Sequence, residues 1–143
     1  MISRAGFGDL SDILRLEQVC FSDDAWSVLD VIWTLTSRST IRCKAITEAG
    51  LCGFAAAEFD RDKANTGWII TLGVFPQYRN QGIGTALLRA CESKLATPQM
   101  RLCVNTNNSD AIHLYQRAGY AEVGLWPGYY ASGCDALVME KNG

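Results

Sequence analysis

The chain has 143 residues, of which 48% are hydrophobic, and a formal net charge of -2 at pH 7. This length allows one domain with a substantial core but not two ordinary ones, so we expect a single domain over residues 1–143. The basic residues are scattered rather than gathered in a stripe, which argues against nucleic acid as a partner. No apolar run is long enough to cross a bilayer and no signal-peptide pattern opens the chain, so we expect a cytoplasmic protein with no membrane partner.

The first half of the chain predicts one strand, two helices and then three more strands. Apolar residues at helical spacing, among them Leu10 and Ile13, favour a helix over residues 9–20. A tight turn at 48–50 and a polar turn at 60–66 join the three later strands into an expected antiparallel meander. The expected ranges are 2–5 for the first strand, 9–20 and 27–37 for the helices, and 41–47, 51–59 and 68–74 for the three strands.

The second half alternates helices and strands. A helix over residues 82–96 should end at Thr97-Pro98, and a helix over residues 109–118 should end at Gly119, a residue typical of C-terminal caps. The strands are expected at 101–104, 120–126 and 134–140. A helical crossover would make the strands at 68–74 and 101–104 a central parallel pair. The complete order, βααβββαβαββ, predicts an α/β fold with a mixed, mainly antiparallel sheet flanked by helices.

Six cysteines occur, at positions 20, 43, 52, 91, 103 and 134, and the only histidine is His113. The cysteines are irregularly spaced, and the sequence contains no C-x-x-C pair or Cys/His cluster. We therefore expect reduced core thiols and no metal site, with a disulfide pair as the lesser alternative.

The segment between residues 74 and 88 joins a strand to a helix through a turn that contains Gly82 and Gly84. Glycines let successive backbone N–H groups converge, and a helix N-terminus adds free donors and the positive end of its dipole, so the segment favours anion binding. Two well-known phosphate loops do not match, because Thr85 stands where a P-loop has lysine and Leu87 stands where a dinucleotide fingerprint has its third glycine. A plain turn that enters a helix is the alternative.

The pattern Arg79-x-x-Gly82-x-Gly84 after this strand resembles the pyrophosphate-binding loop of the GCN5-related N-acetyltransferase (GNAT) family. The resemblance covers the whole chain, through the order of the elements and a second string: Asn108, Leu114-Tyr115 and Gly119-Tyr120. A finer resemblance is to the RimI-type N-terminal acetyltransferases, which acetylate the first residue of a ribosomal protein. It rests on residues near the two ends of the chain: Leu16-Glu17, Phe21, Trp26-Ser27, Gly128-Tyr129-Tyr130 and Asp135-Ala136-Leu137-Val138-Met139.

The resemblance implies acetyl-coenzyme A (acetyl-CoA) as cosubstrate. Backbone N–H groups between Arg79 and Gly84 would hold its pyrophosphate, and the strand at 72–74 would splay from its parallel neighbour and expose main-chain groups to the pantetheine arm, with Gly73 suited to a bulge there. From the residues alone, Arg79 could equally be a solvated charge and Asn108 a plain helix N-cap. The expected coenzyme contacts are Leu72, Gly73, Val74, Arg79, Asn80, Gln81, Gly82, Ile83, Gly84, Thr85, Asn108 and Tyr115.

The same resemblance makes Tyr115 the general acid of a direct transfer, in which a neutral amine attacks the thioester. A thiol pKa of about 8.5 against a phenol pKa of about 10 makes tyrosine a plausible proton donor, and a backbone N–H near Val74 would stabilise the oxyanion. Spacing alone also allows Tyr115 to be a half-buried core aromatic. RimI-type enzymes carry a glutamate, thought to be the base, where this chain has Cys103, so the base is open. The alternatives are a Cys103 and His113 pair, Glu58, Asp135, Tyr129 and Tyr130.

The acceptor is predicted from amine basicity. An α-amine has a pKa of about 8 and a lysine side chain about 10.4, so the α-amine is neutral about 200 times more often, a difference of about 3 kcal/mol. An enzyme without a strong base should therefore favour a protein N-terminal α-amine. The resemblance places Phe21, Trp26, Tyr129 and Tyr130 around such a peptide, although both tyrosines could be turn-flanking aromatics. A small-molecule amine acetyltransferase and a non-catalytic acyl-CoA sensor are the alternative functions.

Overall fold

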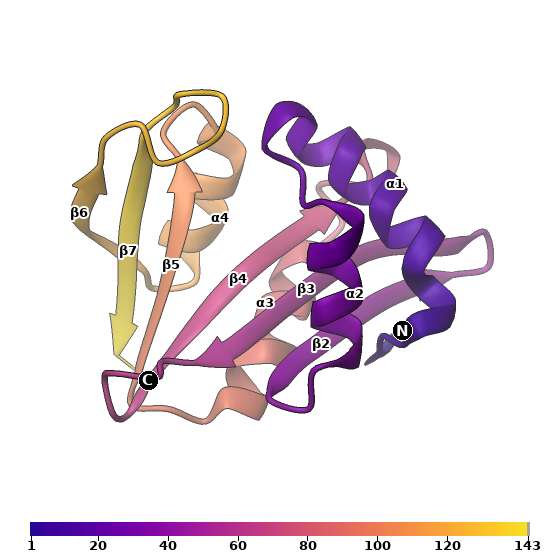
Figure 1. Cartoon of the computed structure of the whole chain (residues 1–143), viewed down its shortest axis with the longest axis horizontal. Helices are drawn as coiled ribbons and strands as arrows, with labels where there is room; N and C mark the ends of the chain where they lie inside the picture. Colours follow the sequence, from indigo (N-terminus) through magenta and orange to yellow (C-terminus); the bar gives the residue numbers. More distant parts are fainter. Residues whose placement is uncertain (143) are drawn as a thin grey trace.

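The structure, a computed structural model, describes residues 1–142 and contains one seven-stranded sheet with the strand order β1-β2-β3-β4-β5-β7-β6 (Figure 1). Three short 3-10 helices, at Phe7–Asp9, Ser22–Asp24 and Pro76–Tyr78, were not expected from the sequence. The strands are β1 (Ile2–Arg4), β2 (Thr40–Thr47), β3 (Gly50–Phe59), β4 (Thr66–Val74), β5 (Gln99–Asn105), β6 (Ala121–Trp126) and β7 (Ala136–Asn142). The α-helices are α1 (Leu10–Phe21), α2 (Val28–Thr36), α3 (Ile83–Leu95) and α4 (Ser109–Arg117).

The sheet confirms the predicted pairing of its central strands. Strands β2, β3 and β4 form an antiparallel meander, and β4 pairs in parallel with β5 after the crossover through α3. Strand β7 lies between β5 and β6, so β6 and β1 are the two edge strands. Strand β7 begins and ends two residues later than the range 134–140 predicted, because Cys134 and Asp135 instead accept hydrogen bonds from the backbone N–H groups of Tyr130 and Gly128.

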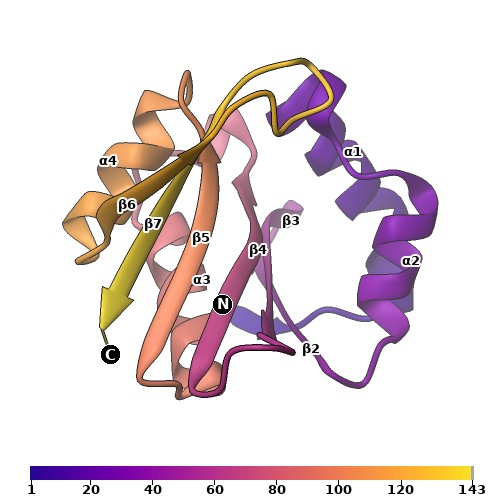
Figure 2. The same ribbon diagram turned by 60° about the vertical axis from the view of Figure 1, so that its left-hand side comes forward.

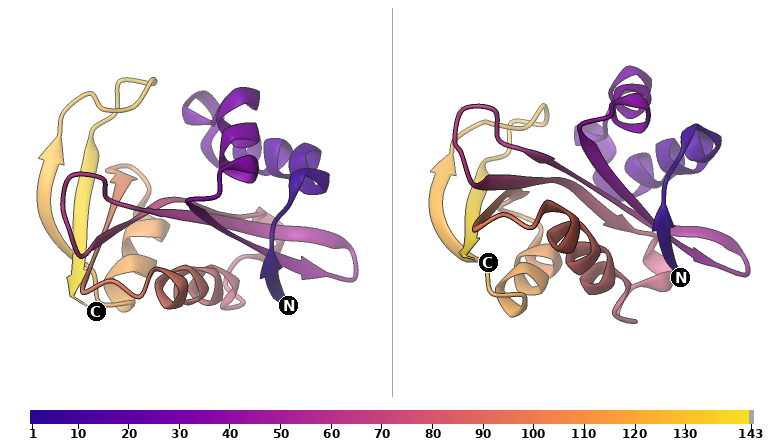
Figure 3. Two further views of the ribbon diagram at one scale, coloured as in Figure 1. Left: turned by 60° about the horizontal axis from the view of Figure 1, so that its bottom comes forward. Right: turned by 90° about the horizontal axis from the view of Figure 1, so that it is seen from below.

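The helices form two layers, one on each face of the sheet. Helices α1 and α2 cover one face, and α3 and α4 cover the other (Figure 3). Each face therefore carries its own hydrophobic core. The α1 and α2 side includes Ile13, Leu16, Val31, Leu35 and Phe54, and the α3 and α4 side includes Leu87, Leu88, Cys91, Leu102 and Met139. Within residues 1–142, no helix combines the length and the apolar composition needed to span a bilayer.

The helix ends follow their sequence signals. The Ser27 and Asp30 side chains form a capping box at the start of α2. The Asn108 side chain accepts a hydrogen bond from the Ala111 N–H (3.2 Å), which confirms its predicted role as the N-cap of α4. Gly119, with φ +103°, follows α4 in the left-handed conformation expected of a helix terminator.

Strands β4 and β5 separate along their length. They pair only from Thr66 opposite Gln99 to Ile69 opposite Leu102, and beyond that point they diverge toward the end of α1 (Figure 1). The splaying expected for residues 72–74 is therefore present. The bulge expected at Gly73 is wrong: Gly73 pairs with Phe54, and the register of β4 against β3 shifts at Ile70 instead. A Cβ on residue 73 would lie 3.3 Å from the Cys20 Sγ, so this glycine makes room for α1.

Candidate functional site

A cavity of about 800 Å³ opens where β4 and β5 part. Residues 69–74 of β4 and residues 103–105 of β5 line two of its sides, and the C-terminal half of α1, the turn before α3 and one side of α4 complete it. The opening of the parallel pair thus brings together segments that are far apart in the sequence.

The turn before α3 is an open set of backbone donors. Gly82 has φ +80°, and no side chain caps the helix that follows. The first hydrogen bond of the helix runs from the Ala86 N–H to the Gly82 carbonyl (3.0 Å), which leaves the preceding N–H groups without helical partners. No acidic side chain lies in this first turn. The turn therefore offers donors and a helix dipole to an anion, as the sequence predicts.

Gly84 has a packing role in addition to the one that the loop pattern suggests. It lies inside the first turn of α3, and a Cβ at this position would be 2.8 Å from the Leu114 Cδ1 of α4. Its lack of a side chain lets the two helices approach each other beside the cavity. Among the glycines of the turn, only Gly82 requires a positive φ.

The Arg79 side chain folds back onto the end of β4. Its Nε donates a hydrogen bond to the Val74 carbonyl (2.9 Å), and an Nη contacts the Cys20 Sγ at 3.5 Å. The Cys20 thiol also donates to the Val74 carbonyl (3.4 Å). Arg79 thus borders the cavity, while its side chain contacts the end of β4 and Cys20 of α1.

Tyr115 projects from α4 into the wall of the cavity and is 6% exposed. Its ring packs edge-on against Tyr120, with 6.0 Å between the ring centres. Burial, together with the nearby Tyr130 and Cys91, raises the pKa of the phenol above its ordinary value, so the hydroxyl stays protonated at neutral pH. The Tyr115 hydroxyl forms no hydrogen bond with another side chain of residues 1–142. Every fully buried polar side-chain atom of these residues has a partner, so this hydroxyl is not fully buried and faces the cavity.

Cys103 lines the cavity from β5. Burial raises the pKa of its thiol to about 11, so the thiol is neutral at physiological pH and is a poor proton acceptor. His113 lines the cavity from α4, but no hydrogen bond joins it to Cys103 in the part of the chain that the structure describes. The Asp135 carboxylate instead accepts the Gly128 N–H at 2.8 Å.

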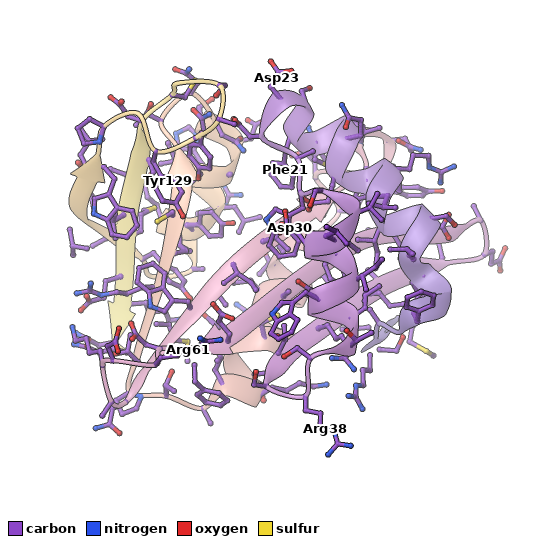
Figure 4. The ribbon with its side chains drawn as sticks, in the orientation of Figure 1. Phe21, Asp23, Asp30, Arg38, Arg61 and Tyr129 are labelled. Carbon is purple, nitrogen blue, oxygen red and sulfur yellow. The ribbon has the colours of Figure 1, made fainter. Side chains whose placement is uncertain are left out.

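Two loops meet beside the part of the cavity that Phe21 and Trp26 line. The loop at residues 127–135 reaches over toward the end of α1 (Figure 2). There the Asp24 carboxylate accepts hydrogen bonds from the Ser132 N–H (2.9 Å) and the Ser132 hydroxyl (3.0 Å). Figure 4 shows Phe21 and Tyr129 on opposite sides of the opening, with Asp23 at the outer end of α1.

Most of the residues expected in the site do line this cavity. Of the expected coenzyme contacts, Gln81 alone lies elsewhere, on a smaller cavity of about 210 Å³ beside β1 and β2. Of the expected acceptor residues, Phe21, Trp26 and Tyr130 line the main cavity. Tyr129 does not, because its ring packs against those of Trp126 and Tyr130.

Several cavity residues were not predicted as site residues, and those on the side of α1 include Glu17, Cys20, Asp24 and Thr71. The Glu17 side chain is nearly inaccessible, and its carboxylate joins two walls by accepting hydrogen bonds from the Trp26 N–H (3.2 Å) and the Thr71 hydroxyl (3.0 Å). The sequence could have indicated Glu17, because it lies on the apolar face of the predicted helix. A charged residue is rarely buried there unless polar groups surround it.

The comparison with family models matches residues 10–120 to the acetyltransferase (GNAT) family. The chain therefore belongs to this family, and the α/β fold with its central parallel pair agrees with the resemblance seen in the sequence. An N-alpha-acetyltransferase RimI from Mycobacterium tuberculosis is 32% identical over 127 residues, which cover 87% of this chain and 80% of the relative. An N-alpha-acetyltransferase from Sulfurisphaera tokodaii is 40% identical over 77 residues, which are 51% of this chain and 46% of the relative, so that match spans only about half of each protein.

Two solved structures share the fold over nearly the whole chain. The ribosomal-protein-S18-alanine N-acetyltransferase from Escherichia coli superposes with a TM-score of 0.85 at 24% identity, covering 99% of this chain and 92% of that one. A chain of the NatC complex bound to Gag peptide and CoA also gives a TM-score of 0.85, at 19% identity, covering 100% of this chain and 98% of that one. At these identities the likeness is one of fold.

Proposed function

We propose that the chain is an acetyl-CoA-dependent N-acetyltransferase that transfers the acetyl group directly to a protein N-terminal α-amine. One observation carries the proposal: the opened β4 and β5 pair, the uncapped start of α3 and the Tyr115 hydroxyl share one cavity. The diphosphate of acetyl-CoA would then lie at the turn, its pantetheine arm along β4 and its thioester near Tyr115.

The residues of the turn fit the diphosphate of the coenzyme. A Cβ at Gly82 would meet no atom within 4 Å, so the backbone there is open to a ligand. No side chain caps the donors of the first turn of α3, and that turn itself contains no acidic residue. Family membership supports acetyl-CoA as the cosubstrate.

Tyr115 is suited to protonate the leaving sulfur. The reaction produces coenzyme A as a thiolate unless a proton is supplied, and the phenol is protonated throughout the physiological pH range because burial raises its pKa. Its hydroxyl has no competing side-chain partner, so it is available to a ligand. No covalent intermediate on the protein is needed.

The α-amine acceptor is supported by relatives and by chemistry. The M. tuberculosis relative carries the name N-alpha-acetyltransferase, and one structural neighbour was solved with a peptide. The 127–135 loop and the turn after α1 meet above the cavity. They would leave a narrow entrance that admits the terminus of a peptide but not a side chain on the surface of a folded protein.

The proposal is tested by two measurements on the whole chain. Calorimetric titration with CoA and with acetyl-CoA should give saturable binding. An acetylation assay on a panel of short peptides, polyamines, aminoglycosides and free amino acids should then modify peptide N-termini selectively. Activity on small amines only would replace the acceptor class, and binding without any transfer would make the chain an acyl-CoA sensor.

A further inference from the structure

Glu17 is a buried carboxylate in the wall of the cavity. It is 2% exposed, and the other buried polar side chains of residues 1–142 are all threonines. Burial of a charge is costly unless the charge is paired, and an unpaired carboxylate that borders a functional cavity needs an explanation. Glu17 is therefore the strongest unexplained charged group near the site.

No cation among residues 1–142 forms an ion pair with Glu17. Its two oxygens accept one hydrogen bond each, from the Trp26 N–H and the Thr71 hydroxyl. Burial raises the pKa of the carboxyl above its ordinary value, the two hydrogen bonds oppose this shift, and Asp30 of α2 adds to it. The other titratable group facing it is Cys20 on α1, which contacts Arg79.

A purely structural role does not require the charge. A glutamine at this position would still accept the Trp26 N–H and bond to the Thr71 hydroxyl, and so would still tie the start of α2 to β4. What only glutamate adds is a negative charge and a site for a proton. The acceptor proposed above arrives as a cation, because an α-amine with a pKa of about 8 is mostly protonated at pH 7.

The charges along the cavity fit this arrival. Glu17 and Asp24 border it from α1 and the turn that follows, next to the expected acceptor residues Phe21 and Trp26. Arg79 borders it from the turn before α3, and Asp110 and Arg117 border it from α4. An incoming ammonium group is thus favoured on the side of α1.

We propose that Glu17 accepts the proton of the incoming α-ammonium group, a role that Cys103 on β5 cannot fill. This inference rests on the proposed function. The ammonium N–H bond breaks and its proton passes to the Glu17 carboxylate, and the freed nitrogen lone pair forms a C–N bond to the acetyl carbon. The C–S bond then breaks, the sulfur takes the phenol proton of Tyr115, and the phenolate recovers a proton from the new amide nitrogen. Glu17 returns its proton to solvent.

The test is the pH profile of kcat/KM for a peptide acceptor, compared between the wild type and Glu17→Gln. The wild-type profile should be flat between the pKa of Glu17 and the amine pKa of about 8, because carboxylate and ammonium together form the reactive pair. The variant should lose about 100-fold at pH 6 and approach the wild type as the pH rises above the amine pKa, because the amine then needs no proton acceptor. CoA affinity should not change.

Two matched variants separate the role of the charge from that of the fold. Asp12→Asn removes an exposed carboxylate from the same helix and should leave the profile unchanged. Thr71→Val keeps the Glu17 charge but removes one hydrogen bond that stabilises it, so the acid limb of the profile should move to higher pH.

Three outcomes would overturn the role of Glu17. The first is a pH profile of kcat/KM in Glu17→Gln that equals the wild-type profile. The second is a loss of kcat/KM in this variant that is the same at every pH. The third applies if Glu17→Gln does not fold, and is an acid limb that Thr71→Val leaves at the wild-type pH. All three presuppose peptide acetylation by the wild type. Absence of that activity would instead refute the proposed function.

Discussion

Asp24 and Ser132 lie 108 residues apart, yet two hydrogen bonds of 2.9 and 3.0 Å join them across the mouth of the cavity. Asp24 ends the turn after α1, and Ser132 belongs to the loop between β6 and β7. The Asn105 amide of β5 approaches the same carboxylate at 3.5 Å. This contact joins one loop to the other beside Phe21 and Trp26, the expected acceptor residues that line the cavity.

Removal of this contact should affect the acceptor more than the coenzyme. We expect Asp24→Ala to raise the KM for a peptide about 3- to 10-fold, since a partly exposed hydrogen bond to a charged group contributes about 1 kcal/mol, while the KM for acetyl-CoA stays the same. Amide hydrogen exchange in residues 127–135 should become faster. Asp23→Ala is the matched control, because Asp23 points outward from the end of α1 (Figure 4). An increase in the KM for acetyl-CoA alone would contradict this role.

Tyr115→Phe should lower kcat about 100-fold or more while CoA affinity and the free energy of unfolding stay nearly unchanged. The hydroxyl is the only atom removed, and it bonds to no other side chain of residues 1–142. Steady-state kinetics, calorimetry and thermal unfolding measure the three quantities.

The neighbouring Tyr120 provides the contrast. Its hydroxyl donates a 2.7 Å hydrogen bond to Glu92, so Tyr120→Phe should cost about 1–2 kcal/mol of stability and leave kcat largely intact. Equal losses of turnover and coenzyme binding in Tyr115→Phe would assign that residue a packing role instead.

The sequence predicts the parts of this fold that local patterns encode. Asn108 and Gly119 mark the two ends of α4 because capping depends on neighbouring residues alone, and the turn at Gly82 is visible because a positive φ favours glycine. The splaying of β4 from β5 was expected only through the family resemblance. These local signals locate the uncapped turn at the start of α3, which forms part of the candidate site.

Other features depend on contacts that spacing does not encode. The insertion of β7 between β5 and β6 is a choice of partners across the sheet, and the Asp24 contact to Ser132 joins distant loops. Glu17 shares the apolar face of α1 with Ile13 and Leu16, so its position in a cavity wall appears only after folding. Gly73 looked like a bulge and proved to be a close approach of α1 to β4.

Gly82→Ala should weaken coenzyme binding through the diphosphate. Alanine at φ +80° is strained by about 1–2 kcal/mol, and relaxation of the turn would redirect its N–H groups. We expect the affinity for CoA to fall about tenfold, or about 1.4 kcal/mol, whereas pantetheine, which lacks the diphosphate, should bind equally to both proteins.

Gly50→Ala controls for backbone strain in the Gly82 comparison. Gly50 has φ +114° in the hairpin between β2 and β3, does not line the cavity, and has open space around it. This variant should be less stable but should bind CoA normally once folded. A parallel loss of pantetheine affinity in Gly82→Ala would show that the turn does not act on the diphosphate.

Cys103 should be dispensable for the reaction although it lines the cavity. With a thiol pKa of about 11, only about 0.03% of the group is thiolate at pH 7.5, so it is neither a base nor an effective nucleophile there. Cys103→Ser should therefore keep kcat/KM within about threefold, a change of less than about 1 kcal/mol.

Alkylation of Cys103 by iodoacetamide, followed by mass spectrometry, provides a second measurement. Because the thiolate forms only as the pH rises, the reaction should be slow at pH 7.5, accelerate toward pH 11 and be blocked by bound CoA. Fast alkylation at neutral pH together with an inactive Cys103→Ser would restore the cysteine as a nucleophile and would require a covalent acetyl-enzyme.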